Sequence, residues 1–237
     1  MKSEPCVKVP IHVIVLTFAV TLGAAVVTMG QQSSPTKHEV WPQINLYFPL
    51  NDKFRIFAMA SEERSGEEGE GFKGTVGIHL DYFWKKRWTL RAGYRHAFRI
   101  GSGDPFKEHR LLFEQTYSRD LAHKFAFHDR NRQEFRTVNG DFSLRFRNRL
   151  RVEREFSGEK RALIPYGSGE LYYDTRFNTF NRYRLMTGVE FRFRKREGAV
   201  LNIRRQKTLD FYYVWQHDSR SSPSRVQAIG ITFGVHF

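Results

Sequence analysis

The sequence predicts an all-β fold, a closed antiparallel transmembrane β-barrel of about 10–12 strands. Three observations lead to this fold class: an apolar segment near the N-terminus, an alternation of apolar and polar residues through most of the remaining chain, and an aromatic residue at the C-terminus. The composition is compatible with a barrel. A chain that is 27% charged and 15% aromatic can direct its apolar residues to lipid and its polar residues to the lumen.

The beginning of the chain has the features of a secretory signal peptide. Lys2 and Lys8 precede an uncharged apolar run from residue 11 to residue 27, and small residues accompany the end of that run. The run is close to the shortest length that spans a membrane as a helix, so an uncleaved anchor is the alternative. The predicted organisation is a signal peptide over residues 1–30, a short polar segment over 31–40 and an outer-membrane barrel over 41–237.

Alternation, which is the period of a β-strand, dominates the chain beyond residue 30. Between Phe180 and Arg194 the odd positions are mostly apolar, as at Leu185 and Phe191, whereas most even positions in its second half are charged. A two-residue period places these sets on opposite faces of a strand, so one face suits lipid and the other suits a polar lumen. Candidate strands cover residues 41–50, 53–63, 71–84, 87–99, 107–118, 124–138, 141–156, 162–175, 178–195, 206–217 and 225–237.

The number of candidate strands is odd, whereas single-chain bacterial barrels normally contain an even number. If every neighbouring pair is antiparallel, a chain that both starts and ends in the periplasm needs an even count. We therefore expect ten strands, with residues 41–50 outside the barrel, or twelve, with one further strand. One connection is well defined, because Asn139-Gly140 is a strong signal for a two-residue hairpin.

The last candidate strand, residues 225–237, is the part of the sequence that best predicts the cellular location. Ile229, Phe233 and Phe237 lie on its apolar face, and the chain stops at Phe237. Such a strand resembles the signal read by the outer-membrane assembly machinery. It predicts the outer membrane of a Gram-negative bacterium, with that machinery and outer-membrane lipid as partners. Tryptophan is enriched at membrane–water boundaries, so we expect interface anchors at Trp41, Trp84, Trp88 and Trp215.

The polar faces of the strands carry many arginines and fewer acids. One interpretation is a cross-strand salt-bridge network that fills a small barrel, because guanidinium groups pair bidentately with carboxylates. The other is an arginine-lined pathway for small anions, since rings of arginine select anions. The predicted lumen residues are Arg91, Arg95, Glu108, Arg110, Glu114, Arg130, Arg132, Glu134, Arg136, Arg145, Arg147, Arg149, Glu170, Arg182, Arg184, Glu190 and Arg192.

Patterns for catalysis, cofactor binding and metal binding are absent from the sequence. His128-Asp129 with Ser143 could be imagined as a triad, but such combinations arise by chance in a chain with nine histidines. Cys6, the only cysteine, precedes the apolar run, so the mature chain would have no thiolate metal site. The net charge of +14 is typical of proteins that bind nucleic acid or anionic membranes, but an export signal argues against nucleic acid.

The sequence therefore predicts a barrel without enzymatic activity, metal or cofactor, acting as a structural element or as a narrow pore with an arginine-rich lumen. An anion-selective channel for small solutes is one alternative. An outer-membrane enzyme that modifies lipids is another.

An ordered series of short motifs gives a resemblance to a known family. The chain resembles the uncharacterised outer-membrane barrels grouped as domain of unknown function 2490. The resemblance implies a barrel in the outer membrane and implies no known activity. It rests on Trp41, Asn51-Asp52-Lys53-Phe54, Gly93-Tyr94-Arg95, Glu108-His109-Arg110, Arg130-x-Arg132-x-Glu134-x-Arg136, Arg145-x-Arg147-x-Arg149, Pro165-Tyr166, Glu170, Asn181-Arg182, Gly188 and Phe237.

Overall fold

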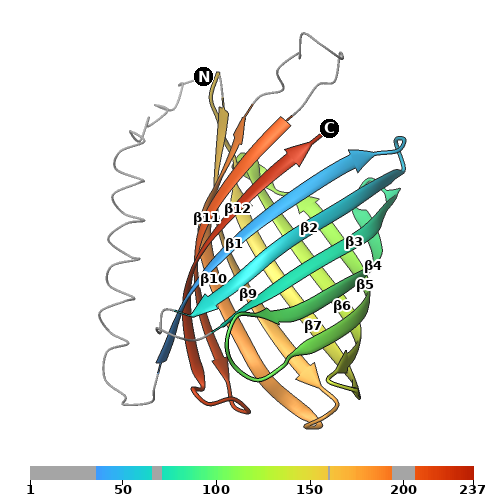
Figure 1. Ribbon diagram of the computed structural model, residues 1–237. Helices are drawn as coiled ribbons and strands as arrows, with labels where there is room; N and C mark the ends of the chain where they lie inside the picture. Colours follow the sequence, from blue (N-terminus) through green and yellow to red (C-terminus); the bar gives the residue numbers. More distant parts are fainter. Residues whose placement is uncertain (1–35, 66–70, 160, 194–205) are drawn as a thin grey trace, which may run out of the picture. The chain divides into compact units, whose positions relative to one another are not determined.

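The computed structural model describes residues 36–65, 71–159, 161–193 and 206–237. The predicted signal peptide, residues 1–30, lies outside the described residues. Within them the chain forms a closed barrel of eleven long strands (Figure 1), which confirms the predicted all-β fold and the closed barrel. No helix in the described ranges is both long and apolar enough to cross a membrane.

Each long strand is hydrogen-bonded to the strands on either side of it. A two-residue strand, β8 (Phe156–Ser157), pairs with the start of β9, and a short 3-10 helix, η1 (Ala122–Lys124), leads into β6. The long strands are β1 (Thr36–Pro49), β2 (Phe54–Ser65), β3 (Phe72–Lys85), β4 (Trp88–Ile100), β5 (Lys107–Asp120), β6 (Phe125–Val138), β7 (Asp141–Arg154), β9 (Arg161–Asp174), β10 (Thr179–Phe193), β11 (Gln206–Asp218) and β12 (Arg225–His236).

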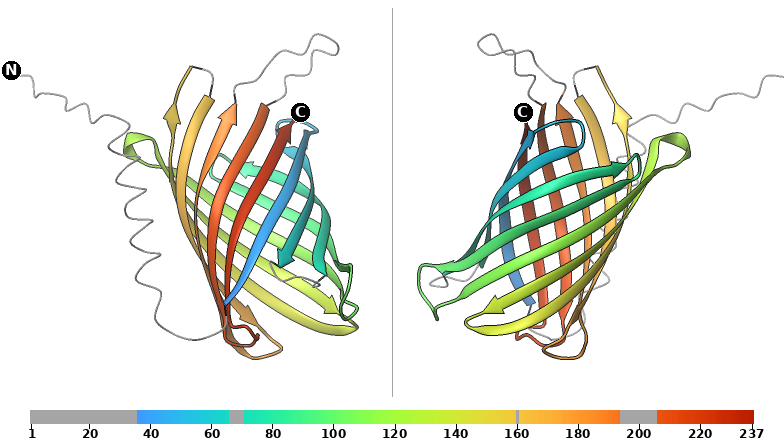
Figure 2. Two further views of the ribbon diagram at one scale, coloured as in Figure 1. Left: turned by 60° about the vertical axis from the view of Figure 1, so that its left-hand side comes forward. Right: turned by 90° about the vertical axis from the view of Figure 1, so that its right-hand side faces the viewer.

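The barrel closes through a parallel pair, whereas all its other neighbouring strands are antiparallel. β1 runs alongside β12 in the same direction, in a register that extends from Thr36 opposite Arg225 to Tyr47 opposite His236 (Figure 2). The expectation that residues 41–50 lie outside the barrel, which led to a count of ten, is therefore wrong. Its premise was an entirely antiparallel barrel; one parallel seam permits an odd number of strands. β1 also includes residues 36–40, which were expected in the polar segment.

The parallel seam can be tested by disulfide cross-linking, because the described chain contains no cysteine. Val40 and Ile229 are partners in the seam, and both are exposed. Paired strands bring Cα atoms within the range that a disulfide bridges. In a Cys6→Ser background, Val40→Cys with Ile229→Cys is expected to cross-link readily on oxidation. Val40→Cys with Phe233→Cys, displaced by roughly 13 Å along β12, should stay reduced, and the reverse preference would contradict the seam.

The two rims of the barrel differ in which connections they hold. The C-terminal rim contains Phe237 and the turns around residues 51–52, 86–87 and 121–124. The opposite rim contains the start of β1 and the connections at 101–106, 139–140, 175–178 and 219–224. Asn139 and Gly140 form the predicted two-residue hairpin, with φ angles of 51° and 102°. Two successive positive φ angles are what this turn requires, and glycine adopts them without steric cost.

Alternation along the strands separates an apolar exterior from a charged lumen. Ile78, Leu111 and Phe142 on the exterior are 57%, 56% and 64% exposed. On the lumen side, Glu134 and Asp174 are at most 1% exposed. The barrel thus reverses the usual arrangement of a water-soluble protein, with apolar side chains outside and ionised ones inside.

Three of the four predicted interface tryptophans lie on the exterior. Trp84 and Trp88 are exposed near the C-terminal rim, and Trp215 lies three residues from the end of β11. Trp41 is only 8% exposed and packs in the lumen against Val214, so its assignment as an outer anchor is wrong. The alternation of β1 explains the difference. Val40, Ile44 and Phe48 occupy the exterior face, which places Trp41 on the other face with the polar residues of the strand.

Candidate functional site: the arginine-rich lumen

A continuous network of ion pairs covers the inner wall from β2 to β9. Each member lies within 4.0 Å of an oppositely charged partner, and the pairs join into one connected set, named here the arginine–carboxylate network. Arginine predominates over acids in it, by nine to six. Its members are Arg55, Arg91, Arg110, Arg130, Arg132, Arg136, Arg145, Arg147 and Arg176 with Asp81, Glu108, Glu114, Glu134, Glu170 and Asp174.

Glu134 on β6 is a central junction of the network. Its Oε1 atom accepts hydrogen bonds from Nη1 of Arg147 at 2.9 Å and from Nη1 of Arg110 at 3.4 Å. The Nη1 atom of Arg132 lies 3.6 Å from the same oxygen. The Glu134 side chain has no exposed surface. A buried carboxylate is stable only where it is paired and hydrogen-bonded, and here three arginines supply the compensating charge.

Glu170 on β9 extends the network across an intervening strand. Its Oε1 atom accepts a hydrogen bond of 2.6 Å from Nη2 of Arg130, which lies on β6, beyond β7. Arg147 on β7 donates to both Glu170 oxygens at 3.0 Å, and the Tyr172 hydroxyl donates to Oε2 at 2.8 Å. Glu170 therefore connects three strands, which limits how far this side of the wall can deform.

Two aspartates anchor the ends of the network. Asp174, at the end of β9, accepts hydrogen bonds from Arg145, Arg136 and Arg176. Arg176 lies in the turn that follows, and its hydrogen bonds to Asp174 raise its pKa. Asp81 on β3 accepts hydrogen bonds from Arg55 and Arg91.

Three predicted lumen arginines have no carboxylate partner among the described residues. The Arg95 Nε atom donates to His79 Nε2 at 3.0 Å. Arg184 donates to the amide oxygen of Gln216 at 2.6 Å and 3.0 Å, and its guanidinium lies 4.7 Å from the centre of the Trp41 ring. No hydrogen bond or ion pair links Arg149 to any residue that the structure describes. These three side chains therefore form no ion pair within 4.0 Å with the residues described, and the charge of Glu170 acts on Arg149 and Arg184 only over a longer distance.

A cavity of about 620 Å³ brings these arginines together with the network. It extends from Arg149 and Tyr212 to Phe106 and Pro223, so it reaches the opposite rim. Eleven arginines and two lysines line it, against five glutamates, and its lining is therefore strongly cationic. Trp41, Tyr172 and Met186 add an apolar patch to the same wall.

The remaining predicted lumen residues lie apart from the network. Arg182 pairs with Asp218 close to the opposite rim. Glu190 and Arg192 pair with each other near the C-terminal rim. Sequence reasoning missed Arg55, Asp81 and Arg176. The period of two could have identified Asp81, because it occupies an odd-numbered position of β3, as the lumen-facing Thr75 and His79 do. Arg176 lies in a turn, where the alternation of a strand gives no information.

Metal ligation finds no support in the described part of the barrel, where no group of three histidine, cysteine, aspartate or glutamate side chains could hold an ion. The model of a family described as protein of unknown function, DUF2490, matches residues 38–227. No protein with a curated description and no solved structure matches the chain.

Proposed function

The chain belongs to the DUF2490 family of proteins of unknown function, and we propose that it is an outer-membrane barrel whose arginine-rich lumen admits small anions. The observation that carries the proposal is the cationic cavity, in which Arg95, Arg149 and Arg184 have no carboxylate partner among the described residues. A partly enclosed charge without an opposite charge close by is unfavourable, so an anion that binds beside these three arginines would stabilise them. Their positions suit an external anion.

The exterior supports a membrane location. Its exposed side chains include Ile44, Leu111, Phe142 and Phe180, and a water-soluble barrel with so much apolar surface would aggregate. The long strands have 12–15 residues, enough for the apolar band, which a tilted strand crosses in about 9–11 residues. Outer-membrane lipid and the assembly machinery would then be the partners of the barrel, in a Gram-negative bacterium.

The lumen supports selection by charge. Rings of arginine favour anions over cations in membrane pores, and guanidinium groups match the geometry of carboxylate and phosphate. The cavity reaches the opposite rim, so a solute would enter there. The proposal includes no catalytic step, and its ligand is a small carboxylate, phosphate or halide.

Planar-bilayer recording under a potassium chloride gradient tests this function. A heat-dependent shift in gel mobility first establishes that the refolded barrel is native. We expect steady openings whose reversal potential shows that chloride is more permeant than potassium, because the lining excludes cations. Cation-selective openings would contradict the proposal.

A structural role is the second candidate, and the arginine–carboxylate network favours it. Fifteen ion pairs, among them Arg130–Glu170 across an intervening strand, fill and stiffen the wall. A folded barrel that remains silent in the bilayer and takes up no anion would support this role in place of the pore.

A further inference from the structure

The ladder between β1 and β2 is interrupted at Pro42. Val40 pairs with Arg64 and Gln43 pairs with Ser61, in one constant register, yet Trp41 and Pro42 have no partner in β2. Proline has no N–H group and cannot donate to a ladder. On its other side β1 stays paired, since Pro42 lies opposite Ile231 of β12. The β1–β2 ladder therefore lacks pairing over two residues on one side of β1, and this unpaired stretch is named here the gap.

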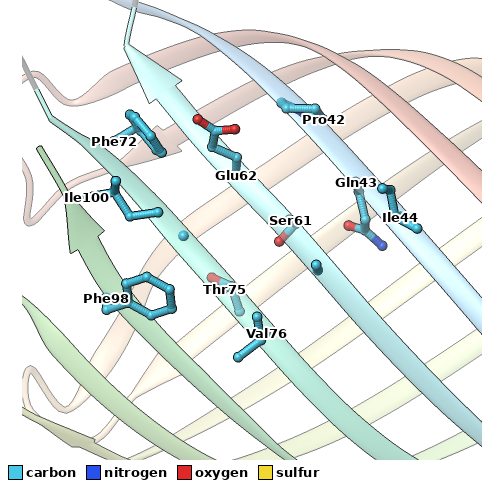
Figure 3. A pocket seen from close by; sticks show the side chains of 12 residues that line it. Pro42, Gln43, Ile44, Ser61, Glu62, Phe72, Thr75, Val76, Phe98 and Ile100 are labelled. Atoms are coloured by element: carbon cyan, nitrogen blue, oxygen red, sulfur yellow. The ribbon is translucent and has the colours of Figure 1, made fainter.

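An apolar groove of about 290 Å³ lies on the exterior beside this gap (Figure 3). Ala60 and Gly74 form its floor, and they leave space because both side chains are minimal. A Cβ atom on Gly74 would lie 2.9 Å from Cδ1 of Ile100, so a larger residue would fill the groove. Glu62, which is hydrogen-bonded to Arg64, is the charged residue of the lining. The apolar walls come from Pro42, Ile44, Phe72, Val76, Phe98 and Ile100.

The groove and the cationic cavity meet at the gap. Pro42, Gln43, Ser61, Glu62 and Thr75 line both. The boundary between the apolar exterior and the cationic lumen therefore consists of polar side chains beside an unpaired stretch of backbone.

Trp41 lies on the lumen side of the gap. Its indole packs against the guanidinium of Arg184, so one of the arginines without a carboxylate partner is close to the end of the lateral path. From outside to inside the path consists of an apolar groove, a polar threshold and a positive charge. The carboxylates beside the threshold are each paired with a cation: Glu62 with Arg64, Glu63 with Lys73 and Glu39 with Lys37. This order suits a molecule with an apolar tail and an anionic head.

We propose that the gap at Pro42 is a lateral binding site for a membrane-derived anionic amphiphile with a single acyl chain. The chain lies in the groove, and the acidic head group passes the gap to reach Arg184 and the cationic cavity. This inference rests on the membrane location and cationic lumen of the proposed function, and adds a ligand that enters from the membrane and not from water.

The head group, and not the chain, provides the selectivity of such a site. Lipid tails are as apolar as the groove, so an acyl chain gains little free energy by moving into it. A carboxylate or phosphate gains charge-assisted hydrogen bonds from arginine, and the Trp41 indole and Met186 form an apolar surface on one side of the cavity. A neutral amphiphile with the same chain should therefore bind poorly.

Photo-cross-linking with two fatty-acid probes tests the site in the refolded full barrel in nanodiscs. One probe carries a diazirine next to its carboxylate, and the other carries it near the methyl end. We expect the first to label the lumen residues Trp41 and Met186, and the second to label Ile44 and Val76 in the groove. A matched fatty alcohol should not label the lumen. Labelling by the carboxylate-end probe that is confined to the exterior, or spread evenly around it, would overturn the proposal.

Two variants close the path in different ways. Pro42→Val restores a backbone donor to the ladder, and Ala60→Phe fills the groove from outside. Each is expected to abolish labelling of Trp41 and Met186. Ala92→Phe, an exterior substitution on β4 that is not part of the groove, serves as the matched control and should leave labelling unchanged. Labelling that persists in both Pro42→Val and Ala60→Phe would refute the lateral path.

Anion selectivity separates this inference from the proposed function. A native barrel that is anion-selective but shows no lumen labelling would refute the lateral site and leave the pore intact. Lumen labelling in a barrel without anion selectivity would support the lateral site and contradict the pore. The Pro42→Val variant should keep its anion selectivity, because it alters the ladder and no lumen charge.

Discussion

Replacing Glu134 with glutamine is expected to lower the free energy of unfolding by about 3–5 kcal/mol, because it leaves buried arginines without their counter-charge. Arg110, Arg132 and Arg147 all lie within 3.6 Å of the Oε1 atom of Glu134, and the carboxylate is fully buried. Glutamine keeps the shape of the side chain and one hydrogen-bond acceptor, so the effect reports the loss of charge. Urea unfolding followed by tryptophan fluorescence measures it, since the free energy of unfolding falls linearly with denaturant.

Glu155→Gln is the matched control for this experiment. Glu155 is 42% exposed in its side chain and lies 3.7 Å from Arg192 near the C-terminal rim. Exposed ion pairs contribute roughly 0–1 kcal/mol, so this variant should unfold close to the native midpoint. Equal stability of the Glu134→Gln and Glu155→Gln variants would show that the arginine–carboxylate network does not hold the barrel together.

Reversing two lumen charges, with Arg149→Glu and Arg184→Glu together, is expected to remove the anion preference of the barrel. Neither arginine has a carboxylate partner among the described residues, so both are available to a permeating anion. Each substitution replaces a positive charge with a negative one in the lining of the cavity, where charge interactions are stronger than in bulk water. Swelling of liposomes in anionic and cationic solutes of matched size should then show no preference between them.

Arg192→Glu controls for a change of overall charge, because Arg192 lies near the C-terminal rim and does not line the cavity. Its anion preference should equal that of the native barrel. Stability gives a second control. Arg149→Gln breaks no ion pair, so its free energy of unfolding should not fall, in contrast to Glu134→Gln. If the Arg149→Glu, Arg184→Glu variant kept the anion preference of the native barrel, other residues would be responsible for the selectivity.

The period of two was sufficient to predict the face of most lumen residues. Arg145, Arg147 and Arg149 alternate with residues that are mostly apolar, and the structure places all three in the lining of the cavity. The pattern is informative because most strands have one apolar face and one charged face, so a slip of one residue would exchange the faces. The position of a residue in the alternation therefore predicts whether its side chain faces the lumen or the exterior, but not which residue it pairs with.

Partners depend on the curvature and stagger of the closed wall. Arg130 pairs with Glu170 across β7, a contact between strands that are not neighbours and whose separation reflects the bend of the barrel. The parallel seam also escaped prediction, because the alternation of β1 is the same whichever way its partner runs. Trp41 was misassigned for a related reason. A tryptophan can lie at a membrane boundary or in a lumen, and only the alternation of the residues around it shows which face of the strand it occupies.

The most direct test of a lumen that binds anions is the anomalous diffraction of bromide in crystals of the barrel grown in sodium bromide. The account predicts bromide within contact distance of the guanidinium groups of Arg149, Arg184 or Arg95 inside the cavity. It also predicts that these sites are lost in the Arg149→Glu, Arg184→Glu variant. Bromide found only on the rims and the exterior, with the cavity filled by water, would contradict it.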